Sequence, residues 1–62
     1  MYFVTKSGTV YTVDTTRRTI NNGKGKEFKY ESCEPIIVGQ NARFYLTGGA
    51  TLVTTHVVRA HA

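Results

Sequence analysis

Three side chains, Cys33, His56 and His61, could carry nucleophilic or metal chemistry. A thiol nucleophile needs a base within hydrogen-bond reach and a third group that orients that base. The Cys-Glu-Pro context of Cys33 indicates a turn, no third group is evident, and 62 residues leave little room for a substrate pocket. We therefore expect no enzyme activity and no cofactor, with Cys33 as a half-buried thiol.

A metal site is not expected from the same side chains. None of their pairs has C-x-x-C or H-x3-H spacing. His56 and His61 are an odd number of positions apart, so on one continuous strand their side chains face opposite sides. His61 is also the penultimate residue, where strands tend to fray.

A glycine- and lysine-rich run, Gly23-Lys24-Gly25-Lys26, resembles part of a phosphate-binding loop. A true P-loop has the pattern G-x-x-x-x-G-K-[ST] between a strand and a helix. Here Glu27 and a predicted strand follow the run, so nucleotide hydrolysis is excluded. The run remains a basic loop that can touch a nucleic-acid backbone.

A nucleic-acid surface is the alternative that the basic composition supports. The formal net charge is +4, although the basic residues are scattered and acids stand between them. Small barrels bind single strands by stacking bases on exposed aromatic rings inside a basic groove. The residues that could contribute are Lys24, Lys26, Lys29, Arg43, Tyr45, His56 and Arg59.

These side chains must be positioned by strands, and the first two form a predicted hairpin. Residues 2–6 and 9–13 alternate in character around a Ser7-Gly8 link. A two-residue link places Val4 opposite Tyr11. On that register the core face holds Tyr2, Val4, Tyr11 and Val13, and the outer face holds Phe3, Thr5, Val10 and Thr12.

A second hairpin closes the chain, with Gly48-Gly49 joining strands at 42–47 and 50–58. A two-residue link here places Phe44 opposite Val53. The predicted inner face holds Phe44, Leu46, Val53 and Val57. The predicted outer face holds Arg43, Tyr45, Leu52, Thr54, His56 and Val58.

Shorter elements fill the middle of the chain. Residues 14–17 predict a turn held by the Asp14 carboxylate, followed by a brief strand at 18–20 and an exposed, mobile loop at 21–26. The strand at 27–31 points Phe28 and Tyr30 inward, and its outward charges suit a sheet edge. A corner follows between Pro35 and Gln40. No segment has helical periodicity, beyond one short turn near 31–34.

The whole chain, residues 1–62, therefore predicts a single all-β domain of five or six short antiparallel strands. At this length a small SH3-like barrel or strongly bent sheet is favoured, because closure hides the sheet edges. An open meander completed by a second copy is the rival arrangement. Cys33 is alone, so no disulfide within the chain can stabilise the fold.

Two stretches support a family resemblance. Residues 36–44, with Gly39 between apolar and polar positions, resemble the approach to a strand in many SH3-like barrels. Through residues 4–14, 18–20 and 38–40, the chain resembles small β proteins of unassigned function from actinobacterial phages. The resemblance implies an accessory protein acting in the host cytoplasm, and it brings no activity or binding residues with it.

The compartment expected from the sequence is the cytoplasm. The first residues are too short an apolar run for a signal peptide, and no stretch is long enough to span a membrane. A lone cysteine fits a reducing environment. We expect no membrane partner.

Protein contact is the leading functional hypothesis. So small a barrel cannot cover all its apolar residues, and contiguous exposed apolar area marks association surfaces. We expect a non-enzymatic protein that binds itself as a homodimer or binds a host protein. The predicted contact residues are Phe3, Val10, Tyr45, Leu52 and Val58.

Overall fold

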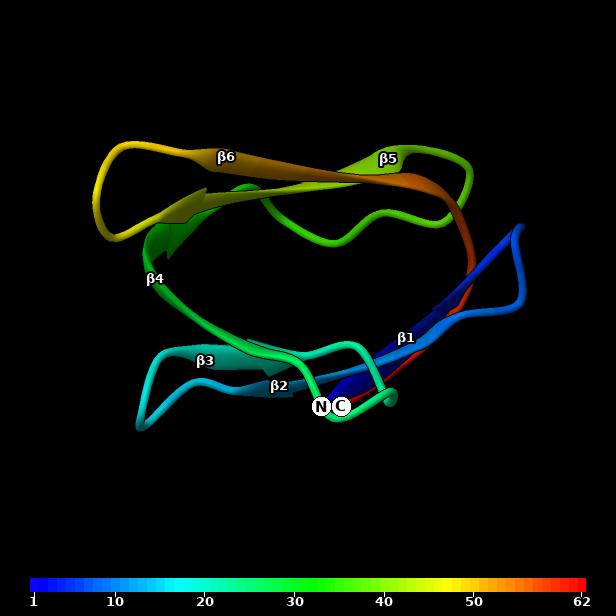
Figure 1. Cartoon of the computed structure of the whole chain (residues 1–62). Helices are drawn as coiled ribbons and strands as arrows, with labels where there is room; N and C mark the ends of the chain where they lie inside the picture. Colours follow the sequence, from blue (N-terminus) through cyan, green and yellow to red (C-terminus); the bar gives the residue numbers. More distant parts are fainter.

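The computed structural model describes all 62 residues as a closed antiparallel barrel of six strands (Figure 1). Each strand pairs with the next in sequence, and the last pairs with the first. The all-β prediction and sheet closure are confirmed, and the open meander is wrong. No helix long and apolar enough to cross a membrane is present. The strands are β1 (Tyr2–Thr5), β2 (Val10–Asp14), β3 (Thr19–Asn21), β4 (Glu27–Cys33), β5 (Asn41–Leu46) and β6 (Thr51–His61).

The barrel consists of two curved layers joined by β4 and β6 (Figure 1). Strand β4 pairs with β3 through residues 27–29 and with β5 through residues 30–33, with an extra residue at Glu31. The predicted sheet edge at β4 is therefore wrong, because both of its halves have neighbours. Its ladder continues to Cys33, so the predicted short turn near 31–34 is absent.

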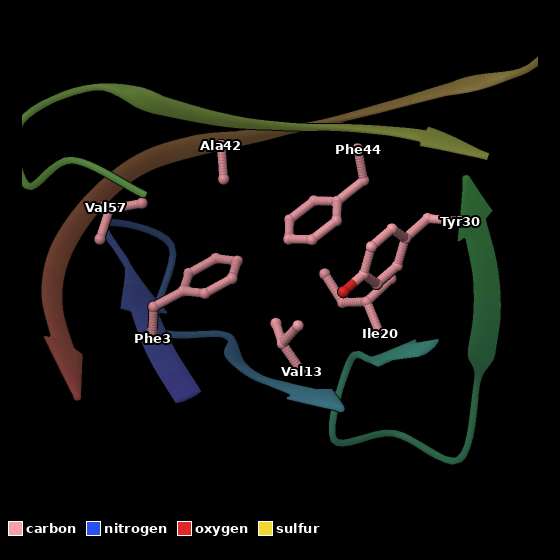
Figure 2. Packing of buried hydrophobic residues seen from close by; sticks show 7 residues of the cluster. All are labelled: Phe3, Val13, Ile20, Tyr30, Ala42, Phe44 and Val57. Carbon is pink, nitrogen blue, oxygen red and sulfur yellow. The ribbon is translucent and has the colours of Figure 1, made fainter. Parts of the chain in front are cut away.

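The core lies between the two layers, with side chains from all six strands pointing inward (Figure 2). Four aromatic rings form a continuous row across it. The Phe3 ring stacks on Tyr11 with ring centroids 5.0 Å apart and on Phe44 with centroids 6.1 Å apart. Tyr30 contacts Phe44 edge-on, with centroids 5.2 Å apart. The buried apolar residues are Phe3, Val13, Ile20, Tyr30, Ala42, Phe44 and Val57.

The first hairpin has a three-residue loop, Lys6-Ser7-Gly8, instead of the predicted two-residue link. The Thr5 amide donates to the Thr9 carbonyl at 3.0 Å, and Gly8 closes the turn at φ 88°. The positive φ explains the glycine. This loop pairs Phe3 with Tyr11, one position away from the predicted register. The prediction that Phe3 and Thr5 face outward is therefore wrong.

The last hairpin departs from its prediction in the same way. Leu46 donates to the Ala50 carbonyl at 2.8 Å, so its loop is Thr47-Gly48-Gly49. Phe44 then pairs with Leu52 instead of Val53. Leu52 packs against the core and Val53 is exposed, which reverses both predictions.

Strand β6 contains two β-bulges, and these bend it from one layer to the other. One lies between Val53 and His56, opposite β5, and the other lies around Val58, opposite β1. Each extra residue shifts the alternation. Thr54 is consequently buried and not exposed as predicted, whereas the inward position of Val57 is confirmed.

Thr54 satisfies the backbone at the first bulge. Its hydroxyl accepts from the Ala42 amide at 3.1 Å and donates to the Thr55 carbonyl at 2.7 Å. The Ala42 amide faces the bulge, where the ladder is interrupted. The Thr54 side chain thus replaces a backbone partner inside the barrel.

The turn and loop between β2 and β4 follow the predicted chemistry. The Asp14 carboxylate accepts from the amides of Thr16 and Arg17, each at 3.0 Å, which confirms the predicted turn. Arg18 closes that turn at φ 55°, so β3 begins one residue later than predicted. Residues 23–26 are exposed as expected, whereas Asn21 and Asn22 are half-buried.

We expect Thr54→Val to lower the free energy of unfolding by about 1–3 kcal/mol, because the buried Ala42 amide loses its acceptor. Thr55→Val changes an exposed neighbour on the same strand and serves as the control. Urea unfolding followed by circular dichroism measures both. Equal stability of the two variants would contradict this role of Thr54.

We also expect Gly23→Ala to destabilise the barrel more than Gly25→Ala. Both glycines have positive φ, which costs an alanine about 1–2 kcal/mol. At Gly23 a Cβ would additionally stand 3.0 Å from the Val10 carbonyl oxygen, whereas at Gly25 it meets open space. Thermal unfolding of the two variants gives the difference, and the reverse order would refute the contact.

Candidate binding surfaces

The acidic residues are confined to one part of the chain, whereas the basic residues are spread along it. All four acids, Asp14, Glu27, Glu31 and Glu34, lie between residues 14 and 34. The neighbouring strands β6 and β1 therefore contain no carboxylate side chain. Their exposed residues include Arg59 and His61, beside the amino terminus. We call the outer surface of β6 and β1 the acid-free face.

Three valines form an apolar row along the edge of this face. Val4 on β1 pairs with Val10 on β2 and with Arg59 on β6. Val58, the extra residue of the second bulge, lies next to Arg59 on the outside. Val10 is 45 % exposed and Val58 is 52 % exposed. We call Val10, Val4 and Val58 the valine row.

An exposed aromatic pair continues the surface beside the valine row. Tyr2, two positions from Val4 on the same face of β1, stacks on His61 with ring centroids 4.9 Å apart. His61 pairs with Tyr2 in the ladder, so the predicted fraying is wrong. The bulge at Val58 also brings His56 and His61 to the same outer side, contrary to the predicted opposite sides.

A shallow polar pocket of about 240 Å³ lies at the other bulge of β6. The Lys6 amide donates to the His56 carbonyl at 2.8 Å, which holds the first loop against β6. The Thr55 hydroxyl donates to Ser7 Oγ at 3.3 Å. The lining residues are Lys6, Asn41, Thr55 and His56.

The five predicted protein-contact residues do not share one surface. Phe3 is fully buried and Leu52 packs against the core, so neither is available. Val10 and Val58 come together around Val4. Tyr45 lies apart on β5, opposite Thr51 at the far end of β6. The outward position of Val4 was missed because it depends on loop length, and the glycine third in the loop was the available signal.

The predicted nucleic-acid residues fall into three separate groups. Lys24, Lys26 and Lys29 belong to the β3–β4 side, where Glu27 and Glu31 accompany them. Arg43 and Tyr45 lie on β5, and His56 and Arg59 lie on β6.

Tyr45 is directly paired with an acid. Its hydroxyl donates to Glu34 Oε2 at 3.0 Å. This hydrogen bond is the main reason that the pKa of Tyr45 is raised, with smaller contributions from burial and from the Glu34 charge. Tyr45 is the one aromatic residue among the predicted nucleic-acid residues, and the Glu34 carboxylate beside it would repel a phosphate backbone.

The glycine- and lysine-rich loop does not offer its amides to a phosphate. Asn21 Oδ1 accepts from the Gly23 amide at 2.8 Å, and Asn22 Oδ1 accepts from the Lys24 amide at 2.9 Å and the Lys26 amide at 3.3 Å. The Lys26 ammonium lies 5.9 Å from the Phe28 ring centroid. The loop is internally hydrogen-bonded by its asparagines.

Cys33 has neither the environment nor the neighbour of a nucleophile. It is exposed, contrary to the predicted half-buried thiol, and partial desolvation and then the Glu34 charge raise its pKa. Cys33 pairs with Phe44, whereas His56 pairs with Asn41, three residues away on β5. These rungs are about 10 Å apart along the strand, beyond hydrogen-bond reach. No three His, Cys, Asp or Glu side chains are grouped to hold a metal ion.

The fold and these surfaces define a small closed all-β barrel with one outer side, formed by β6 and β1, whose strands have no acidic side chain. No family model, curated protein or solved structure matches the chain.

We expect Glu34→Gln to lower the pKa of Tyr45 towards the ordinary tyrosine value, because the charged acceptor favours the protonated phenol. Wild-type Tyr45 should therefore ionise at higher pH than in the variant. An NMR titration of the Tyr45 ring measures this, with Glu31→Gln as a control that should leave it unchanged. An unaltered pKa in Glu34→Gln would contradict the hydrogen bond.

Proposed function

We propose that this protein is a non-enzymatic accessory barrel that binds another protein through the outer surface of β2, β1 and β6. The observation that carries the proposal is the valine row. Val10 and Val58 are exposed, and Val4, which pairs with Val10 and with Arg59, is half-buried between them although the same residue type fills the core. A contiguous exposed patch of this kind is typical of an association surface.

The charges around the valine row favour an acidic partner over a second copy. Arg59 pairs with Val4, and neither β1 nor β6 has an acidic side chain. A symmetric dimer through this face would bring like charges together, because the same patch meets itself. Given the resemblance to phage accessory proteins, we propose an acidic protein of the host cytoplasm as the partner.

The size of the barrel is consistent with such a contact. The accessible surface is 4077 Å², and a standard interface covers roughly 800 Å² on each partner. About one fifth of the molecule would therefore be covered.

Nucleic-acid binding is the second candidate, favoured by the net charge of +4 and by the acid-free face. Single strands need aromatic platforms for stacking. Tyr45 is bonded to Glu34, and Tyr2 is already stacked on His61. The shortage of free platforms makes this the weaker proposal.

We expect Val58→Asp to weaken partner binding about 30-fold or more, because an interface then buries an unpaired charge. Val53→Asp is the matched control: Val53 is also exposed on β6 but pairs opposite Arg43, away from the valine row. Tagged wild type and both variants, checked by thermal unfolding, are used to capture partners from actinobacterial lysate, one half of which is treated with nuclease and the other half left untreated. Binding of the captured protein is then measured with purified components.

The proposal requires one acidic protein that binds wild type and Val53→Asp and is lost with Val58→Asp. Equal loss in both variants would refute the valine row as the contact. Capture that disappears after nuclease treatment, with steep salt dependence, would favour nucleic acid. A wild-type dimer in sedimentation that Val58→Asp dissociates would favour a second copy.

A further inference from the structure

The polar pocket at the first bulge of β6 carries a separate inference. We propose that the pocket lined by Lys6, Asn41, Thr55 and His56 binds a phosphate group. The pocket differs in place and in chemistry from the valine row, so this inference goes beyond the proposed protein contact.

The pocket exists because three elements meet at the bulge. Three residues of β5, 41–43, lie opposite four residues of β6, 53–56, so β6 has one extra residue here. The extra residue turns Thr54 inward while Thr55 stays exposed. The first loop is held over this irregularity by the bond from the Lys6 amide to the His56 carbonyl. Bulges are frequent beside functional sites for this reason, since they redirect side chains.

Hydroxyl groups hold the loop wall of the pocket in place. Thr5 Oγ1, on a buried residue, is hydrogen-bonded to Ser7 Oγ at 3.0 Å, and Ser7 Oγ accepts from Thr55 at 3.3 Å. This chain connects the barrel interior to the loop and then to β6. Lys6 therefore belongs to an anchored loop, and an anchored site loses less entropy when it binds a ligand.

The lining groups suit an oxyanion. The Lys6 ammonium supplies three donors, the Asn41 amide supplies two, and neutral or charged imidazole supplies at least one from His56. No Asp or Glu lies in residues 1–13 or 35–62, which contain the whole lining. A cation would meet the Lys6 charge without an acidic ligand, so an anion is preferred. The volume of about 240 Å³ is below that of pockets for drug-sized ligands and suits a small group.

The test is an NMR titration of the labelled protein with inorganic phosphate, compared with chloride at matched ionic strength. We expect saturable shifts centred on the four lining residues with phosphate only. Lys6→Gln should weaken binding about 10-fold, equivalent to about 1.4 kcal/mol. Lys24→Gln, in the basic loop that lines no part of the pocket, is the charge-matched control and should bind like wild type. Asn41→Asp adds a carboxylate at nearly constant shape and should abolish the shifts.

Further arms distinguish the source of the phosphate. If free phosphate and a short oligothymidylate both shift the resonances of the lining residues, the pocket binds phosphate and accepts a phosphodiester as a ligand. Shifts with free phosphate alone would support it with a phosphate ion or monoester. The inference would be overturned if phosphate gave the same shifts as chloride, or if Lys6→Gln and Lys24→Gln weakened phosphate binding equally. It would also be overturned if the oligothymidylate shifts were confined to residues 22–29.

Discussion

The contact between Phe3 and Phe44 connects the two layers of the barrel, and the rest of the structure depends on it. The rings come from β1 and β5, are fully buried, and are nearly parallel at 6.1 Å. Tyr11 and Tyr30 extend the row towards β2 and β4. Removing a buried aromatic ring typically costs about 3–5 kcal/mol. A domain of this size has a total stability of only about 3–9 kcal/mol. So small a core leaves little redundancy.

Closure of the sheet and the candidate surfaces have a common origin in β6. Eleven residues of this strand pair with β5 first and with β1 afterwards, and two bulges supply the bend. The first bulge sends Thr54 into the core and opens the polar pocket beside Thr55. The second brings Val58 out beside Arg59 and completes the valine row. The irregularities that close the barrel therefore also create the features available for binding.

The confinement of the acids to one sector of the barrel follows from the strand order. In this barrel each strand lies beside its neighbours in sequence, so a charge bias along the chain becomes a sector around the barrel. Asp14 ends β2, Glu27 and Glu31 belong to β4, and Glu34 follows β4 directly. The strands β6 and β1, far apart in sequence, become neighbours only through closure, and together they form the acid-free face. One side of the barrel thereby lacks acidic side chains.

Alternation and turn residues in the sequence determined that the chain forms short antiparallel strands, the Asp14 turn and the inward positions of Phe28 and Tyr30, whereas the choice between a closed barrel and an open meander was made by the tertiary structure. Alternation states that neighbouring residues face opposite sides, but it does not state which side is the interior. Tertiary structure decided that through register: each glycine hairpin has one loop residue more than predicted, which turned Phe3 and Leu52 inward. It also decided where β6 bulges, because an extra residue is defined only against a partner strand. The polar pocket was beyond prediction for the same reason, since Lys6 and His56 meet only when the first loop docks on the last strand.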